Sequence, residues 1–161
     1  MRLTDVLSRD NVISDLGASE KRELLDEMAS DLCERVGGLD REKLLEMLLE
    51  REKLGSTGIG HGVAIPHGKI KGIEEVLVAF GRSRKGVDFN SMDDKPVHLF
   101  FMIVAPENST AVHLKVLASI SRLLRDSGFR KRLIKASSGE EIYRIIAEED
   151  ERLNSAVRIR H

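Results

Sequence analysis

The sequence predicts a single α/β domain in which a mixed central β-sheet is flanked by helices. Apolar residues recur at helical spacing near the start of the chain and again after Pro106, with short strand-like apolar runs between. One of these runs, residues 97–105, is nearly all apolar, as in a central strand covered on both faces. The 161 residues suffice for one sizeable core. We therefore assign residues 1–150 to the domain and 151–161 to a C-terminal tail that we expect to fray.

Two helices are predicted near the N-terminus. The first spans residues 19–38, with Ser19 as its N-cap and a glycine pair at its end. The second spans residues 40–55 and is opened by Asp40. The sole cysteine, Cys33, lies on the apolar stripe of the first helix, and we interpret it as a core residue. A single cysteine allows no intrachain disulfide and no thiolate metal cluster.

The rest of the domain is predicted to hold short strands followed by three helices. The strands expected are 63–65, 76–80, 86–89 (as a strand or a bulge) and 97–105. Of the helices, the first has Thr110 as its N-cap and the second covers 127–135. The third covers 138–146 and starts with a capping box formed by Ser138 and Glu141.

Charge and hydropathy exclude several classes of protein. The 26 basic and 27 acidic residues give a net charge of −1, so nothing points to nucleic acid as a partner. The N-terminus lacks the apolar core of a signal peptide. No stretch approaches the roughly 18–20 apolar residues that a membrane span requires. We expect a cytoplasmic protein that is not embedded in a membrane, and its oligomeric state cannot be inferred from the apolar helix faces.

A glycine-rich segment, GSTGIGHGVAIPHGK at residues 55–69, is the strongest local signal. It is not a Walker loop, because five residues rather than four separate Gly62 from Gly68 and Ile70 follows the lysine. It is not a dinucleotide loop either, because it leads into a strand rather than a helix. Backbone N–H groups in such a segment can form an anion-binding nest, which makes Gly60, Gly62 and Gly68 candidate binding residues.

His67 is the candidate reactive residue of this segment, since it directly follows a predicted strand and stands between Pro66 and Gly68. A neutral imidazole is a nucleophile that can carry a covalent intermediate. His113 falls in the first turn of a predicted helix, where the helix N-terminus favours anions. If the two preceding strands are parallel, both histidines lie at the same edge of the sheet. This arrangement would suit a histidine that accepts a phosphoryl group.

A metal site is the competing interpretation. His61, His67 and His113 could together ligate a metal ion in a hydrolase. Their separation in sequence matches no metal-binding motif, so we favour a histidine that acts as itself and expect no metal and no cofactor.

The segment 55–69 resembles the active-site segment of phosphotransferase-system (PTS) enzyme IIA domains of the fructose/mannitol class. Residues 86–124 are similar to the same family in order and spacing, and the likeness runs from about residue 3 to residue 150. The resemblance implies the enzyme IIA fold and a phosphotransferase component with a phosphohistidine intermediate. In such a relay the phosphocarrier HPr donates a phosphoryl group, and a IIB cysteine receives it in transporters.

The resemblance also implies roles for individual residues. His67 matches the phosphorylated position, His113 the second active-site histidine, and Arg51 an arginine beside the site whose paired donors can hold phosphoryl oxygens. His61 stands where relatives often have asparagine or aspartate, and we interpret it as a loop residue without a chemical role. Of the two remaining histidines, His98 is expected to be a packed or edge residue of a strand and His161 to be disordered.

Within the family, the chain resembles most the free-standing nitrogen-regulatory branch. Proteins of that branch bind other proteins according to their phosphorylation state. The alternative is a fructose-type sugar-transport IIA that passes its phosphoryl group to a IIB cysteine. The expected partners are thus an HPr-type phosphocarrier and either a IIB domain or regulated target proteins. Ile59 and Val63 are candidates for an exposed apolar docking face.

Overall fold

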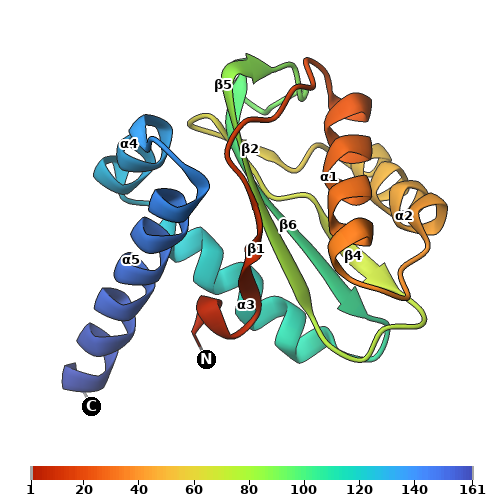
Figure 1. Cartoon of the computed structure of the whole chain (residues 1–161). Helices are drawn as coiled ribbons and strands as arrows, with labels where there is room; N and C mark the ends of the chain where they lie inside the picture. The colour runs from red at the N-terminus through yellow and green to blue at the C-terminus, as the bar shows by residue number, and fades with distance from the viewer. Residues whose placement is uncertain (1, 161) are drawn as a thin grey trace.

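The computed structural model describes residues 2–160, with side chains for residues 2–155, and its centre is a mixed six-stranded sheet (Figure 1). The strands are β1 (Leu7–Ile13), β2 (Gly58–Gly60), β3 (Val63–Ala64), β4 (His67–Ile70), β5 (Leu77–Val87) and β6 (Val97–Pro106). Their order is β1-β5-β6-β3-β2, and β4 pairs with β6 beyond β3. β5 and β6 are antiparallel, whereas β3 and β4 both run parallel to β6. The mixed sheet confirms the predicted fold class.

Helices cover both faces of the sheet, as Figure 1 shows. On one face lie α1 (Lys21–Arg35) and α2 (Arg41–Lys53). On the other lie α3 (Thr110–Leu123), α4 (Ser127–Lys135) and α5 (Gly139–Arg160), with the short 3-10 helix η1 (Leu3–Asp5). Along β6, Phe100, Met102 and Val104 face the core beneath α1 and α2, and Phe101, Ile103 and Ala105 face the core beneath the other helices. A strand buried on both faces reads as one continuous apolar run, which is why β6 was predictable.

The helix starts differ slightly from expectation. Glu20 rather than Ser19 caps α1, and its carboxylate accepts hydrogen bonds from the N–H groups of the first turn. Asp40 caps α2 as predicted. The N-cap of α3 is Ser109, so Thr110 is the first helical residue. These shifts of one residue leave the packed faces of the helices unchanged.

Three strands were not expected from the sequence. β1 was missed because its centre is polar and exposed, as befits an edge strand with a single neighbour, β5. β4 and β2 are four and three residues long and lie within the glycine-rich segment. β5 is longer than predicted and includes the charged run at residues 82–85, ending at Val87.

The C-terminal segment 151–160 belongs to α5, and His161 lies outside the described residues. Fraying of this tail stays a prediction. Cys33 is half-buried and packs against the core beneath α1, and burial raises the pKa of its thiol. No helix within residues 2–160 combines the length and the apolar character needed to cross a membrane.

Candidate active site

His67 lies on β4, and the register with β6 determines which way its side chain points. Within the parallel ladder His67 is opposite Ile103 and Lys69 is opposite Ala105. Neighbours in register point to the same face of a sheet, so His67 and Lys69 point toward α3. Gly68 points the other way, toward α2. The site is thus built on the α3 side of the sheet.

The hydrogen bonding of His67 determines which ring nitrogen carries the hydrogen. Nδ1 lies 2.6 Å from the carbonyl oxygen of Ile65. Because a carbonyl oxygen only accepts, Nδ1 of the neutral ring carries the hydrogen and Nε2 carries the lone pair. Burial has the largest effect on the pKa of His67 and lowers it below its ordinary value of 6.5; the charge of Arg51 lowers it further, while the Ile65 carbonyl and Glu52 oppose this shift. These contacts favour a neutral imidazole whose lone pair is on Nε2.

His113 comes from the first turn of α3 and lies against His67. The two ring centroids are 5.3 Å apart and the planes are inclined by 72°, an edge-to-face arrangement. The side chain is buried, and its Nε2 has no hydrogen-bond partner among the residues with described side chains. Burial, followed by the charges of His67 and Lys69, lowers the pKa of His113. The structure therefore brings the two predicted histidines together, as the parallel strands required.

Arg51, the third predicted site residue, lies in the last turn of α2. Its Nη1 donates a 2.9 Å hydrogen bond to the carbonyl oxygen of Gly55. Its positive charge is among the causes that depress the pKa of His67, which places the guanidinium within electrostatic reach of that ring. Of the three predicted residues, the rings of His67 on β4 and His113 on α3 are in contact, and Arg51 on α2 acts on His67 through its charge.

Glu52 supports the site, although no sequence motif predicted it. Its buried carboxylate accepts hydrogen bonds from the backbone N–H and the hydroxyl of Thr57, and it forms a 2.9 Å ion pair with Lys21. These bonds tie the end of α2 to the start of the glycine-rich segment. A weaker signal existed, because Glu52 continues the buried stripe of α2 formed by Leu44 and Leu48.

Gly68 has a packing role that the geometry makes explicit. A Cβ atom built at this position would lie 2.0 Å from the sulfur of Met47. No real side-chain carbon tolerates such an approach, so the absence of a side chain lets α2 pack closely on β4. The expected role of Gly68 in anion binding thus competes with a structural reason for glycine.

Gly60 and Gly62 lie away from His67. Both have positive φ, +94° and +75°, as has His61 between them with +58°. The carbonyl of Gly62 accepts from the N–H of Leu99, whereas His67 is opposite Ile103. Four residues of strand separate these positions, about 13 Å along β6. The glycines are required by the turn, and the expected anion nest is not assembled around His67.

A hollow of about 640 Å³ adjoins the turn formed by Gly60, His61 and Gly62. It is lined by Ile59, Gly60, His61, Gly62, Met92, Asp93, Lys95, Pro96 and His98. The backbone N–H of His61 donates to the carboxylate of Asp93, and Nδ1 of His98 lies 2.8 Å from the carbonyl oxygen of Ser83. Within the described residues no group of three metal-ligating side chains is found, and His61 is not part of the His67–His113 pair. The competing metal triad is therefore not assembled.

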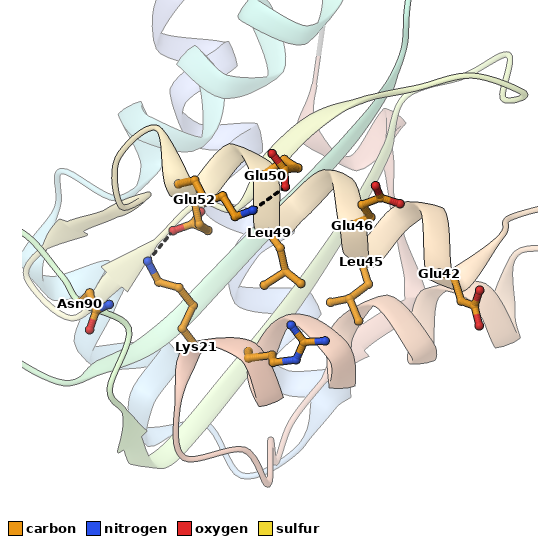
Figure 2. Close-up of a pocket in the computed structure, with 10 residues that line it drawn as sticks. Lys21, Glu42, Leu45, Glu46, Leu49, Glu50, Glu52 and Asn90 are labelled. Carbon is orange, nitrogen blue, oxygen red and sulfur yellow. Dashed lines mark hydrogen bonds and ion pairs between the residues drawn. The ribbon is translucent and has the colours of Figure 1, made fainter.

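A further groove of about 570 Å³ runs between α1 and α2 (Figure 2). Leu45 and Leu49 point into it from α2, and the Lys21–Glu52 ion pair closes one end. Neither this groove nor the hollow beside His61 includes His67 or His113.

Apolar side chains are exposed close to the site residues in sequence. Leu54 follows the helix that carries Arg51 and is 84% exposed, and Leu114 follows His113 and is 59% exposed. Ile59 is 46% exposed, as expected, whereas Val63 is buried because it lies on β3 against β6. The expectation that Val63 is exposed was wrong.

Comparison with known proteins finds relatives among phosphotransferase components. Residues 5–149 match the family model described as "Phosphoenolpyruvate-dependent sugar phosphotransferase system, EIIA 2". A nitrogen regulatory protein of Bradyrhizobium diazoefficiens is 42% identical over 147 residues, which are 91% of this chain and 95% of the relative. The fructose-specific EIIABC component of Bacillus subtilis is 40% identical over 151 residues, 93% of this chain but 24% of that protein. The crystal structure of nitrogen regulatory protein IIA-Ntr from Neisseria meningitidis superposes with a TM-score of 0.83 at 37% identity, covering 89% of this chain and 98% of that one.

Proposed function

Because the chain belongs to the EIIA type-2 family of the phosphoenolpyruvate-dependent sugar phosphotransferase system, we propose that it is a phosphoryl carrier that uses Nε2 of His67. The donor is the phosphohistidine of an HPr-type phosphocarrier protein. One observation carries the proposal: the Nδ1–H of His67 is bound by the Ile65 carbonyl, which leaves the lone pair on Nε2, and the ring lies against that of His113, whose buried Nε2 finds no partner among the described side chains.

The transfer is an in-line displacement at phosphorus. The Nε2 lone pair forms the new N–P bond while the P–N bond of the donor breaks, and its electron pair returns to the donor ring. His67 keeps the proton on Nδ1 and becomes a cationic phosphoimidazole. The carbonyl of Ile65 accepts from Nδ1 throughout, so this positive charge is stabilised without any movement of the ring.

Arg51 and His113 are proposed to bind the phosphoryl oxygens from two sides. The guanidinium of Arg51 offers several N–H donors in a planar fork that suits a phosphoryl group. His113 brings Nε2, which finds no partner among the described side chains and is a donor when it carries the ring proton. Neither role needs a cofactor.

Exposed apolar side chains suit docking of a protein donor rather than a small molecule. Leu54 lies three positions after Arg51 and Leu114 directly follows His113, and Ile59 adds a third exposed aliphatic side chain. A relay must exchange partners, so we propose small, short-lived contacts with the donor and with the next protein.

We favour a regulatory role for the phosphorylated protein over a role in sugar transport. The 42% identity with a nitrogen regulatory protein over nearly the full length of both chains supports this branch. A phosphoryl group on His67 adds about two negative charges to the site and would change which proteins bind there. The match to a fructose-specific EIIABC component keeps a second candidate, a transport IIA that passes the group to a IIB cysteine. The proposal retains the expected cytoplasmic location.

The test is intact-mass spectrometry after incubation with phosphoenolpyruvate, enzyme I and HPr, beside a His67→Ala variant. We expect one acid-labile phosphoryl group on the wild-type protein and none on the variant. A folded wild-type protein that stays unmodified while HPr is charged would refute the proposal. Subsequent addition of a IIB domain separates the two outputs, because only a transport IIA transfers the group to the IIB cysteine.

A further inference from the structure

Lys69 lies on the same face of the sheet as His67, at the N-terminus of α3. The two residues are separated by one position on β4, so their Cα atoms are about 7 Å apart and both side chains point toward α3. Nζ of Lys69 donates a 2.5 Å hydrogen bond to the hydroxyl of Thr110, the first residue of that helix. A contact between residues 41 positions apart thus anchors the lysine beside the reactive histidine.

Lys69 has no anionic partner within the part of the chain whose side chains the structure describes. None of the ion pairs among the described side chains involves it, whereas Lys21 and Lys53 each bind a carboxylate. The hydroxyl of Thr110 is a neutral acceptor and occupies one of the three N–H donors of the ammonium group. Two donors and an uncompensated positive charge remain next to His113, whose pKa burial lowers first and the charges of His67 and Lys69 lower further.

The N-terminus of α3 favours an anion because its N-cap side chain does not accept from the backbone N–H groups of the first turn. The N-cap Ser109 makes no side-chain cap, because its hydroxyl donates to the carbonyl of Pro106 instead. The first turn of α3 carries no acidic residue. Its N–H groups therefore keep their partial positive charge unneutralised by the helix itself.

His113 provides an independent indication that a ligand binds here. It belongs to the same turn of α3, is only 8% exposed, and has an Nε2 atom without a partner among the described side chains. A buried polar atom without a partner is costly, and a ligand oxygen would satisfy it. The His113 ring contacts that of His67, and the ammonium group of Lys69 is bound to Thr110 in the same turn of α3, so both groups lie at the start of one helix.

We propose that Lys69 is a phosphoryl-binding residue, held in position by Thr110, whose Nζ donates to an oxygen of the phosphoryl group carried by His67. The inference rests on the proposed function and extends it to a residue that the family resemblance did not single out. Arg51 approaches the phosphoryl group from α2, and Lys69 approaches it from the α3 side with His113.

The equilibrium between phospho-HPr and the phosphorylated carrier distinguishes this role from partner docking. A lysine that only contacts HPr changes the rate of transfer but leaves the equilibrium constant unaltered, since that constant depends on the separated proteins. A lysine that binds the phosphoryl group stabilises the product, and so its loss shifts the equilibrium toward phospho-HPr. A charge-assisted hydrogen bond predicts a shift of about tenfold or more.

The experiment uses the full chain with Lys69→Met, Lys69→Arg and the matched control Lys71→Met, which removes an exposed lysine just beyond β4. Phosphoryl groups on HPr and on each variant are quantified by mass spectrometry after equilibration. We expect the shift for Lys69→Met, a partial return for Lys69→Arg, a smaller shift for Thr110→Val and none for Lys71→Met. Circular dichroism confirms that each variant is folded.

Three outcomes would overturn the inference. An unchanged equilibrium in Lys69→Met refutes it while the proposed function stands, provided that wild type and variant are both phosphorylated. Equal shifts in Lys69→Met and Lys71→Met would show that the effect comes from the overall charge of the protein and not from a bond between Lys69 and the phosphoryl group. A wild-type protein that charged HPr does not phosphorylate refutes the proposed function and this inference together.

Discussion

The imidazole rings of His67 and His113 meet edge to face with their centroids 5.3 Å apart, although the residues come from a strand and a helix that are far apart in sequence. Burial lowers the pKa of both rings, and a charge on His67 would lower that of His113 further. The pair is thus kept neutral, which is the state in which one ring can attack phosphorus and the other can contact its oxygens.

The rate of phosphoryl acceptance should fall at acid pH. Transfer requires the unprotonated Nε2 of His67, so the rate is present above the folded-state pKa and lost as pH falls through it. Burial, followed by the charge of Arg51, lowers that pKa below 6.5, and the loss is therefore expected below pH 6.5. Rapid-quench measurement of transfer from phospho-HPr between about pH 5 and 8 tests this, with HPr phosphorylation controlled at each pH. A rate that already declines above about pH 7 would contradict a neutral His67 with a depressed pKa.

His113→Gln should slow phosphorylation of His67 without abolishing it. Glutamine keeps a donor near the phosphoryl oxygens but loses the ring contact with His67, and we expect a reduction of about ten- to a hundredfold. Rapid-quench kinetics measures the rate, and intact mass confirms that modification stays at one site. His98→Gln is a control, because His98 lies on β6 with Nδ1 bound to the Ser83 carbonyl. Equal effects of the two substitutions would argue against a direct role for His113.

Arg51→Gln should lower the rate and also shift its pH profile. The guanidinium both offers donors to the phosphoryl group and depresses the pKa of His67, so its removal raises that pKa and moves the acidic limb to higher pH. A loss of about tenfold or more is expected at the pH optimum. Lys53→Gln, two positions along in the same helix turn and paired with Glu50, is the matched control. If the midpoint of the pH profile is unchanged in Arg51→Gln, the charge of Arg51 does not lower the pKa of His67.

The sequence predicted the candidate site histidines better than their surroundings. His67 and His113 were recognisable because each follows a predicted strand, and the helix rules placed His113 in a first turn. Lys69 was not, because its direction depends on the register of β4 against β6, a pairing between segments that are distant in sequence. The same register explains why Gly60 and Gly62, although near His67 in sequence, lie about four residues further back along β6.

Gly68→Ala should destabilise the fold rather than only weaken anion binding. The added Cβ would meet the sulfur of Met47 at 2.0 Å, and such overpacking costs about 1–3 kcal/mol in free energy of unfolding. Urea unfolding measures the loss. Gly37→Ala, where a Cβ meets nothing within 4 Å, is the control. Met47→Ala in the Gly68→Ala background should recover part of the loss, and strictly additive effects of the two substitutions would contradict the proposed steric cause.

Arg82 ties the end of β1 to α4 across the sheet, and its replacement should destabilise the fold more than Gly68→Ala does. The guanidinium is fully buried on β5 and donates to the carbonyls of Ser14, Leu133 and Ala136, so that it satisfies the C-terminal end of α4. Arg82→Met would leave the carbonyls of Ser14 and Leu133 without the Arg82 donors and that of Ala136 with only the 3.4 Å hydrogen bond from Arg84, and we expect a loss of about 3 kcal/mol or more in the free energy of unfolding. Arg84→Met removes a half-exposed arginine of the same strand, ion-paired with Asp15, and should change stability far less. Urea unfolding measures the free energy of unfolding of both variants. Similar losses in the two would mean that the buried hydrogen bonds of Arg82 contribute no more to stability than a surface ion pair.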